Sequence, residues 1–141
     1  MSQENVELIR AAAATYNAGD FDAHLALYAP DAEWVPDVST FPEATPPRGR
    51  DEIRRFIEGT RDGFMNLRYE LSEVFAVGAD RVLARGDWGG QGEASGIETY
   101  SSLTTVWTVR HGKISRTEFF FNHDEALEAV GLSEQDAYDD P

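Results

Sequence analysis

Arg85 and Asp87 are the residues whose types and spacing most directly suggest chemistry. Side chains two positions apart on a β-strand point to the same face of the sheet, so the guanidinium could polarise a substrate while the carboxylate moves protons. The same spacing is also typical of a solvated strand face. Glycines at positions 86, 89 and 90 allow bulges that change the register of this strand, so both interpretations stay open.

Asp37 and Tyr100 are the two residues that could assist such a pair. Asp37 directly follows Pro36, which ends a short strand-like segment. Tyr100 lies near the start of a long alternating segment and has a hydroxyl that can donate a hydrogen bond. As an amphipathic side chain, Tyr100 is also typical of the boundary between a core and solvent.

Aromatic side chains form the second group of candidate functional residues. A cavity lined by aromatic rings favours a flat, apolar ligand. The alternative is that the rings fill a core, because aromatic residues dominate protein interiors. The candidate ligand-binding residues are Tyr16, Trp34, Phe64, Trp107, Phe119 and Phe121, and Trp88 has the same two interpretations.

Several other chemistries find no support in the sequence. The absence of cysteine removes disulfides, thiolate nucleophiles and cysteine-based metal sites. The three histidines, His24, His111 and His123, lack the spacing of metal ligands, and Ser101 and Ser102 lack the context of a catalytic serine. We therefore expect neither a metal nor a cofactor. From its helical phase, we expect His24 at the surface or at the rim of a pocket.

The N-terminal half of the chain has the periodicity of helices. Apolar residues at helical spacing predict a helix over residues 3–17, and a second apolar stripe runs from Phe21 to Tyr28 before Pro30 ends it. A third helix is predicted to begin at Asp51, because the helix dipole favours acidic residues in the first turn. The apolar stripe on its buried side is predicted to consist of Ile53, Phe56, Ile57 and Phe64.

Strand patterns dominate the rest of the chain. Residues 32–35 resemble a short strand, and the proline-rich residues 37–48 indicate an irregular loop that could form a rim or lid. The longer predicted strands are residues 68–77, 81–91, 99–110 and 113–122, and a last short helix runs from the Asn122 cap to Gly131. This order predicts an α+β fold with helices on one face of a bent antiparallel sheet.

Length and charge indicate one acidic globular domain. With 141 residues the chain has the length of a single domain, and we assign residues 1–132 to it and residues 133–141 to an acidic, flexible tail. The net charge of −14 disfavours nucleic acids and anionic membranes, and it favours neutral or cationic small partners. The sequence has no long apolar run and does not begin like a signal peptide, so we expect a cytoplasmic protein.

Five local phrases, in this order and spacing, resemble the SnoaL-like branch of the NTF2-like superfamily over residues 3–132. They are Asn17-Ala-Gly-Asp-Phe-Asp, Tyr28-Ala-Pro-Asp-Ala-Glu-Trp, Arg48-Gly-Arg-Asp-Glu-Ile, His111-Gly-Lys-Ile-Ser and Glu125-Ala-Leu-Glu-Ala-Val-Gly-Leu. The resemblance implies a cone-shaped α+β barrel, in which three N-terminal helices lie on the concave side of a bent antiparallel sheet and a short C-terminal helix follows. It also implies a pocket at the wide end of the cone.

The superfamily includes ketosteroid isomerases, whose site combines a carboxylate base with a tyrosine and a protonated aspartic acid. In this sequence the three corresponding positions hold Ala12, Pro36 and Ser101, so that pattern is absent. A shift of one residue would bring Asp37 to the position of the base.

Limonene-epoxide hydrolases of the superfamily have another pattern, Arg-x-Asp on a middle strand with a second aspartate on the last strand. The first part resembles Arg85-Gly86-Asp87, whereas the second acid aligns with Phe119. Polyketide cyclases also place an acid near that position. Glu118 is adjacent, but strand alternation sends it to the opposite face, so the two-carboxylate mechanism is incomplete.

A homodimer formed through the sheet is the oligomeric state that the resemblance implies. The alternating pattern is predicted to place Val106, Ile114 and Phe120 on the convex side of the sheet. Apolar side chains there would leave a surface that a second copy of the chain could cover.

Two functions therefore stay open, and the sequence does not decide whether the protein is an enzyme. The first is binding of a neutral, apolar or aromatic small molecule, with cofactor-free acid–base chemistry of the isomerase, cyclase or epoxide hydrolase type. The second is a non-catalytic binding or assembly module whose cavity is filled by its own side chains. Arg85 and Asp87 favour the first, and Phe119 favours the second.

Overall fold

Helices and strands follow one another along the chain in the predicted order, and the computed structural model describes residues 2–37 and 45–132. The elements are α1 (Ser2–Ala18), α2 (Phe21–Leu25), β1 (Tyr28–Val35), α3 (Arg50–Arg61), β2 (Phe64–Val77), β3 (Arg81–Gly92), β4 (Glu98–Arg110), β5 (Lys113–Phe120) and α4 (His123–Ala129). The predicted tail and most of the predicted lid, residues 38–44, lie outside the described residues.

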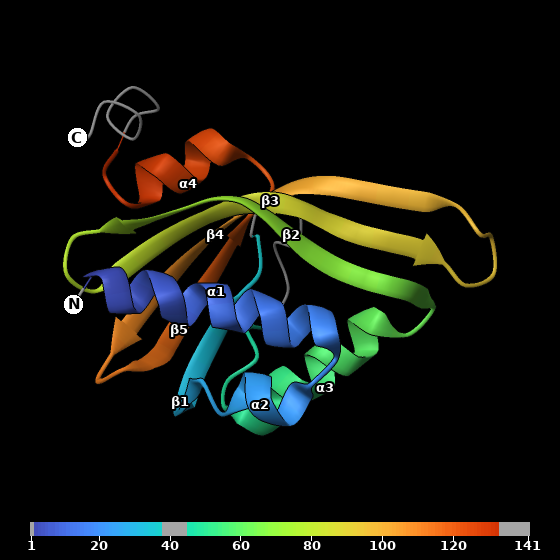
Figure 1. Ribbon diagram of the computed structural model, residues 1–141, viewed down its shortest axis with the longest axis horizontal. Helices are drawn as coiled ribbons and strands as arrows, with labels where there is room; N and C mark the ends of the chain where they lie inside the picture. Colours follow the sequence, from blue (N-terminus) through green and yellow to red (C-terminus); the bar gives the residue numbers. More distant parts are fainter. Residues whose placement is uncertain (1, 38–44, 133–141) are drawn as a thin grey trace.

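One bent sheet separates the helices into two layers, as Figure 1 shows. Its strand order is β1-β5-β4-β3-β2, in which β1 runs parallel to β5 and every other pair is antiparallel. The helices α1, α2 and α3 cover the concave face, and α4 lies on the convex face. This arrangement confirms the predicted α+β architecture.

The first strand begins earlier than predicted, and the second helix is correspondingly shorter. The backbone carbonyl of Leu27 accepts a hydrogen bond from the backbone N–H of Ile114, at 2.9 Å, so pairing with β5 is already established there. Tyr28 therefore lies in β1 and not on a helix. The hydrogen bond between β1 and β5 overrides the helical spacing of Phe21, Leu25 and Tyr28. The shorter helix α2 therefore buries His24 together with Leu25.

Glycines let neighbouring backbones approach closely where the sheet bends. A Cβ atom on Gly86 would overlap the backbone carbonyl of Glu70, and one on Gly89 would overlap that of Thr99. The facing strand β2 shifts register twice, between Met65 and Arg68 and between Leu71 and Glu73. The predicted bulges therefore lie on β2, opposite the glycine-rich strand.

Asn17 fastens the end of α1 to β2. Its side-chain amide donates to the backbone carbonyl of Tyr69 at 3.0 Å, and its side-chain oxygen accepts from the backbone N–H of Tyr69 at 2.7 Å. Because β2 is an edge strand, this amide takes the place of a neighbouring strand at that position. These two hydrogen bonds, here called the Asn17 clamp, hold the end of α1 with Tyr16 on the same side of the sheet as Tyr69.

The convex face is covered differently from the prediction. Val106 is fully buried in a cluster with Leu83 and Leu127, and Phe120 packs against that cluster. Ile114 belongs to the core on the concave side. The predicted apolar surface for a second copy is therefore wrong, because α4 covers Val106 and Phe120 while Ile114 faces the other way.

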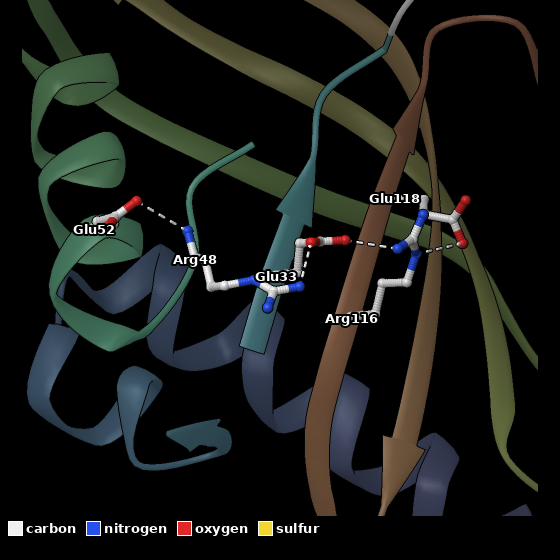
Figure 2. Close-up of polar contacts among 5 residues, drawn as sticks. All are labelled: Glu33, Arg48, Glu52, Arg116 and Glu118. Carbon is white, nitrogen blue, oxygen red and sulfur yellow. Dashed lines mark hydrogen bonds and ion pairs between the residues drawn. The ribbon is translucent and has the colours of Figure 1, made fainter. Parts of the chain in front are cut away.

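Backbone hydrogen bonds and ion pairs join the segment around Pro47 and Arg48 to β1 at the edge of the sheet, and Figure 2 shows the ion pairs. The carboxylate of Glu33 on β1 contacts Arg48 at 2.8 Å and Arg116 on β5 at 2.6 Å. The backbone N–H of Trp34 also donates to the carbonyl of Pro47 at 3.0 Å. Exposed ion pairs contribute little individually, so we attribute the position of Pro47 mainly to the backbone pairing.

Asn17→Ala tests the clamp between α1 and β2. We expect a decrease of about 1–3 kcal/mol in the free energy of unfolding, because both backbone groups of Tyr69 lose their partner. Urea denaturation followed by circular dichroism measures the change. Gln3→Ala, which removes an exposed hydrogen bond on the same helix, should change stability by less than about 0.5 kcal/mol. Equal effects of the two substitutions would contradict the assignment.

Candidate functional site

A cavity of about 190 Å³ lies between the helices α1–α3 and the concave face of the sheet. Its wall is almost entirely apolar. The aromatic side chains in this wall come from helices and strands throughout the fold, and they are Tyr16, Tyr28, Trp34, Phe56, Tyr69, Trp88, Trp107, Phe119 and Phe121. The cavity is therefore not filled by its own side chains.

Five of the six predicted ligand-binding residues line this cavity: Tyr16, Trp34, Trp107, Phe119 and Phe121. Phe64 does not, because α3 ends at Arg61 and Phe64 is exposed at the start of β2. The prediction had placed Phe64 on the buried side of the helix. Phe56, one of the residues on α3 that do line the cavity, belongs to the same predicted apolar stripe.

Arg85 and Asp87 do not line the cavity, so the prediction that they face a pocket is wrong. Trp88 faces the cavity, and strand alternation sends its neighbour Asp87 to the convex face, where it is exposed. Arg85 lies on that face too, opposite Glu73 of β2. Tyr100 is exposed and pairs with Gly89, which also places it on the convex face.

Asp37 is the predicted catalytic residue that does line the cavity. It follows β1 and is only 5% exposed. Its Oδ2 atom accepts a hydrogen bond from the backbone N–H of Phe121 at 2.9 Å, just beyond the end of β5. The parallel pairing of β1 and β5 thus brings the carboxylate to the wall beside Phe121, which also lines the cavity.

His24 also lines the cavity and is 2% exposed, so its predicted place at the surface or rim is wrong. Its Nδ1 atom lies 2.9 Å from the backbone carbonyl of Ala12, which can only accept, so Nδ1 carries the proton. The Nε2 atom then accepts from the hydroxyl of Tyr28 at 3.0 Å. The Tyr28 oxygen in turn accepts from Nε1 of Trp34 at 3.3 Å.

Burial keeps this chain of side chains neutral. It lowers the pKa of His24 to about 4, partly offset by the hydrogen bond to Ala12, and it raises the pKa of Tyr28 above its usual range. The polar groups of the sheet in the wall are likewise paired: Tyr69 donates to the carbonyl of Leu103 at 2.8 Å, and Trp107 donates to Thr105 at 2.7 Å. Both networks are satisfied within the wall and leave few donors for a ligand.

Tyr16 differs from these residues. Its hydroxyl oxygen accepts from Nε1 of Trp88 at 3.1 Å, and no acceptor for its own O–H is found among residues 2–37 and 45–132. Burial raises the pKa of Tyr16, while the hydrogen bond from Trp88 and the nearby charge of Arg61 lower it. Tyr16 therefore presents a neutral O–H donor to the cavity.

Residues 9–117 match the model of the SnoaL-like domain. The chain belongs to this family. Curated proteins gave no significant match.

Solved structures similar to this SnoaL-like protein have the same fold. A hypothetical protein from Catenulispora acidiphila with a ketosteroid isomerase-like fold, in complex with trimethylamine, is 20% identical with a TM-score of 0.71, over 89% of this chain and 93% of that one. An NTF2-like protein of unknown function from Burkholderia pseudomallei is 21% identical with a TM-score of 0.73, over 94% and 100%. TerC, co-crystallised with polyporic acid, is 25% identical with a TM-score of 0.72, over 90% and 98%.

Neither a metal site nor a membrane-spanning helix is found in the described part of this SnoaL-like protein. No group of three or more histidine, aspartate or glutamate side chains there could hold a metal ion. None of the helices there is long and apolar enough to cross a membrane.

His24 should make stability depend on acid pH. Its pKa is about 4 in the folded protein and about 6.5 in the unfolded chain, so unfolding takes up a proton between these values. The free energy of unfolding should therefore be highest above pH 6.5 and should decrease by about 3 kcal/mol as the pH falls to 4. Urea denaturation at pH 7 and pH 4 should show this loss reduced in His24→Gln and unchanged in His111→Asn, which alters an exposed turn. An identical pH dependence in His24→Gln would contradict it.

Proposed function

We propose that this SnoaL-like protein binds a neutral, apolar or aromatic small molecule in the cavity and moves a proton on it without a cofactor. In this proposal Asp37 is the general base and Tyr16 is the hydrogen-bond donor. The observation that carries the proposal is that a buried carboxylate lies in the wall of one apolar cavity together with a phenol whose O–H has no acceptor among residues 2–37 and 45–132. The exposed pair Arg85 and Asp87 has no part in it.

The chemistry that suits these two groups is a proton shift next to a carbonyl. The carboxylate of Asp37 takes a proton from the carbon beside the carbonyl, and the O–H of Tyr16 donates to the oxygen on which negative charge develops. Asp37 then returns the proton to another carbon of the same ligand. Apolar surroundings favour this step, because a fixed donor stabilises charge more strongly where water is excluded.

The size of the cavity favours a ligand with one ring. An engineered apolar cavity of roughly 150 Å³ holds benzene. The cavity here is about 190 Å³, which leaves room for a six-membered ring with one small substituent. Larger polycyclic ligands would not fit within this volume.

Two relatives add support for small-molecule binding. The Catenulispora acidiphila protein was solved in complex with trimethylamine, and TerC was co-crystallised with polyporic acid. We extend the binding of a small molecule, and not either ligand, to this chain, and we assign it to the cavity.

Non-catalytic binding is the second candidate function, and Phe119 favours it. The family resemblance places an acid at this position in epoxide hydrolases and near it in polyketide cyclases. Here the Phe119 ring packs edge-to-face against Trp34, with ring centroids 4.9 Å apart. In that case Asp37 would mainly hold the end of β5 through Phe121.

Isomerisation of 3-cyclohexen-1-one to 2-cyclohexen-1-one tests the catalytic proposal. The substrate has one ring, and the reaction moves one proton from C2 to C4. We expect Asp37→Asn to lower the rate about 100-fold or more, and Tyr16→Phe about 100-fold, by loss of the base and of the donor. The absorbance of the conjugated product measures the rate.

Asp87→Asn separates this proposal from the one made on sequence. We expect it to leave the rate unchanged, because Asp87 is exposed on the convex face. Loss of activity in Asp87→Asn, together with an active Asp37→Asn, would refute the assignment. Quenching of the three tryptophans, all of which line the cavity, by a ketone that is never turned over would favour non-catalytic binding.

We also propose that the protein is a homodimer formed through its sheet. Beyond α4 the convex face exposes Met65 and Tyr100, which lie near the start of β2 and of β4. Light scattering at micromolar concentration should give the mass of a dimer. Tyr100→Glu should lower the measured mass toward that of a monomer, because it places a charge in the contact. A monomer at every concentration would contradict the proposal.

A further inference from the structure

Arg61 contacts Tyr16 without lining the cavity itself. Its guanidinium carbon lies 5.1 Å from the centroid of the Tyr16 ring and 5.4 Å from that of the Phe21 ring. One of its nitrogens also donates to the backbone carbonyl of Tyr16 at 3.1 Å. Arg61 is the last residue of α3, so these contacts join the end of that helix to the end of α1.

Two positively polarised groups therefore act on one phenol. The cation of Arg61 lies over the Tyr16 ring, and the N–H of Trp88 points at the Tyr16 oxygen. Both favour negative charge on that oxygen, so both strengthen the O–H as a hydrogen-bond donor. Burial opposes ionisation and keeps the side chain neutral, as the direction of its pKa shift indicates. The result is a strong donor that does not lose its proton.

The position of the phenol makes the charge of Arg61 effective. Tyr16 lies in an apolar wall, where a charge a few ångströms away is screened less than it would be in water. Arg61 is half-buried between two rings, and its planar guanidinium suits stacking better than an ammonium group. A lysine at this position would keep the charge but would lose much of the stacking of a planar group on the rings of Tyr16 and Phe21.

A purely structural role for Arg61 is the alternative. The carbonyl of Tyr16 is among the last of α1, and a cation near the C-terminus of a helix is stabilising whatever the cavity does. This role would affect stability and leave the donor strength of the phenol unchanged. The two roles therefore differ in a spectroscopic property of a bound carbonyl.

We propose that Arg61 is a positioning residue that acts through Tyr16, fixing the phenol and strengthening its O–H toward the carbonyl oxygen of a ligand. This inference rests on the proposed function, since it needs a ligand oxygen beside Tyr16. It extends the site to a residue outside the cavity.

Infrared spectroscopy of bound 2-cyclohexen-1-one labelled with ¹³C at the carbonyl tests the proposal. A stronger donor lowers the carbonyl stretching frequency, so the wild-type protein should show a shift to lower frequency that Tyr16→Phe abolishes. We expect Arg61→Gln to lose a large part of this shift and to lower kcat for 3-cyclohexen-1-one roughly tenfold, with KM nearly unchanged. Arg61→Lys should lie between Arg61→Gln and the wild type.

Arg54→Gln is the matched control. Arg54 lies on the same helix and pairs with Asp22 at 2.8 Å, so its removal takes away the same charge and another contact between α3 and α2. It should leave the carbonyl frequency at the wild-type value. An Arg61→Gln protein that is folded and shows the wild-type frequency would overturn the proposal.

The remaining outcomes separate this inference from the proposed function. A ketone that fails to bind the wild-type protein would refute both. A Tyr16-dependent shift that Arg61→Gln leaves unchanged would refute only the role of Arg61. Should Arg61→Gln fail to fold, the test passes to Arg61→Lys, for which a frequency equal to that of the wild type would refute the proposal.

Discussion

Polar groups in the wall of an apolar cavity must find hydrogen-bond partners within the wall, and the site depends on how they do so. The carbonyl of Ala12 fixes the proton of His24 on Nδ1, which in turn commits the hydroxyl of Tyr28 to Nε2. Trp107 is similarly committed to Thr105. Because these groups are paired with one another, they leave few hydrogen-bond donors for a ligand. Tyr16 is the exception, because its oxygen accepts a hydrogen bond while its own O–H points to no acceptor in the described residues.

The architecture was largely predictable because it depends on patterns that are local in sequence. Helical spacing in α1, strand alternation around the His111 turn and the Asn122 cap each agree with the structure. The order of the elements, together with five local phrases, predicts the family that the match over residues 9–117 confirms. The boundary between α2 and β1 was not predictable from periodicity, because the contact that decides it joins Leu27 to Ile114, far apart in the sequence.

The site was predicted less well, and the reason is strand register. Asp87 and Trp88 are neighbours, so a single step of alternation decides which of them faces the cavity, and the glycines of β3 carry no side chain that would reveal the phase. Asp37 was recognised as a candidate only through a possible shift of one residue. The parallel pairing of β1 with β5, which places it beside Phe121, cannot be read from local sequence. The predicted position of His24 at the surface or rim was wrong because α2 has only five residues, which is too short for helical spacing to show which side chains are buried.

In the proposed complex, a ligand in the cavity directs its oxygen to Tyr16 and its reacting carbon to Asp37. A crystal structure of the protein with bound 2-cyclohexen-1-one tests it most directly. We expect the ketone oxygen within about 3 Å of the Tyr16 hydroxyl and the ring against the aromatic wall, with C4 toward the carboxylate. A ring bound with its oxygen turned toward solvent, or a ketone bound only on the convex face beside Asp87, would contradict it.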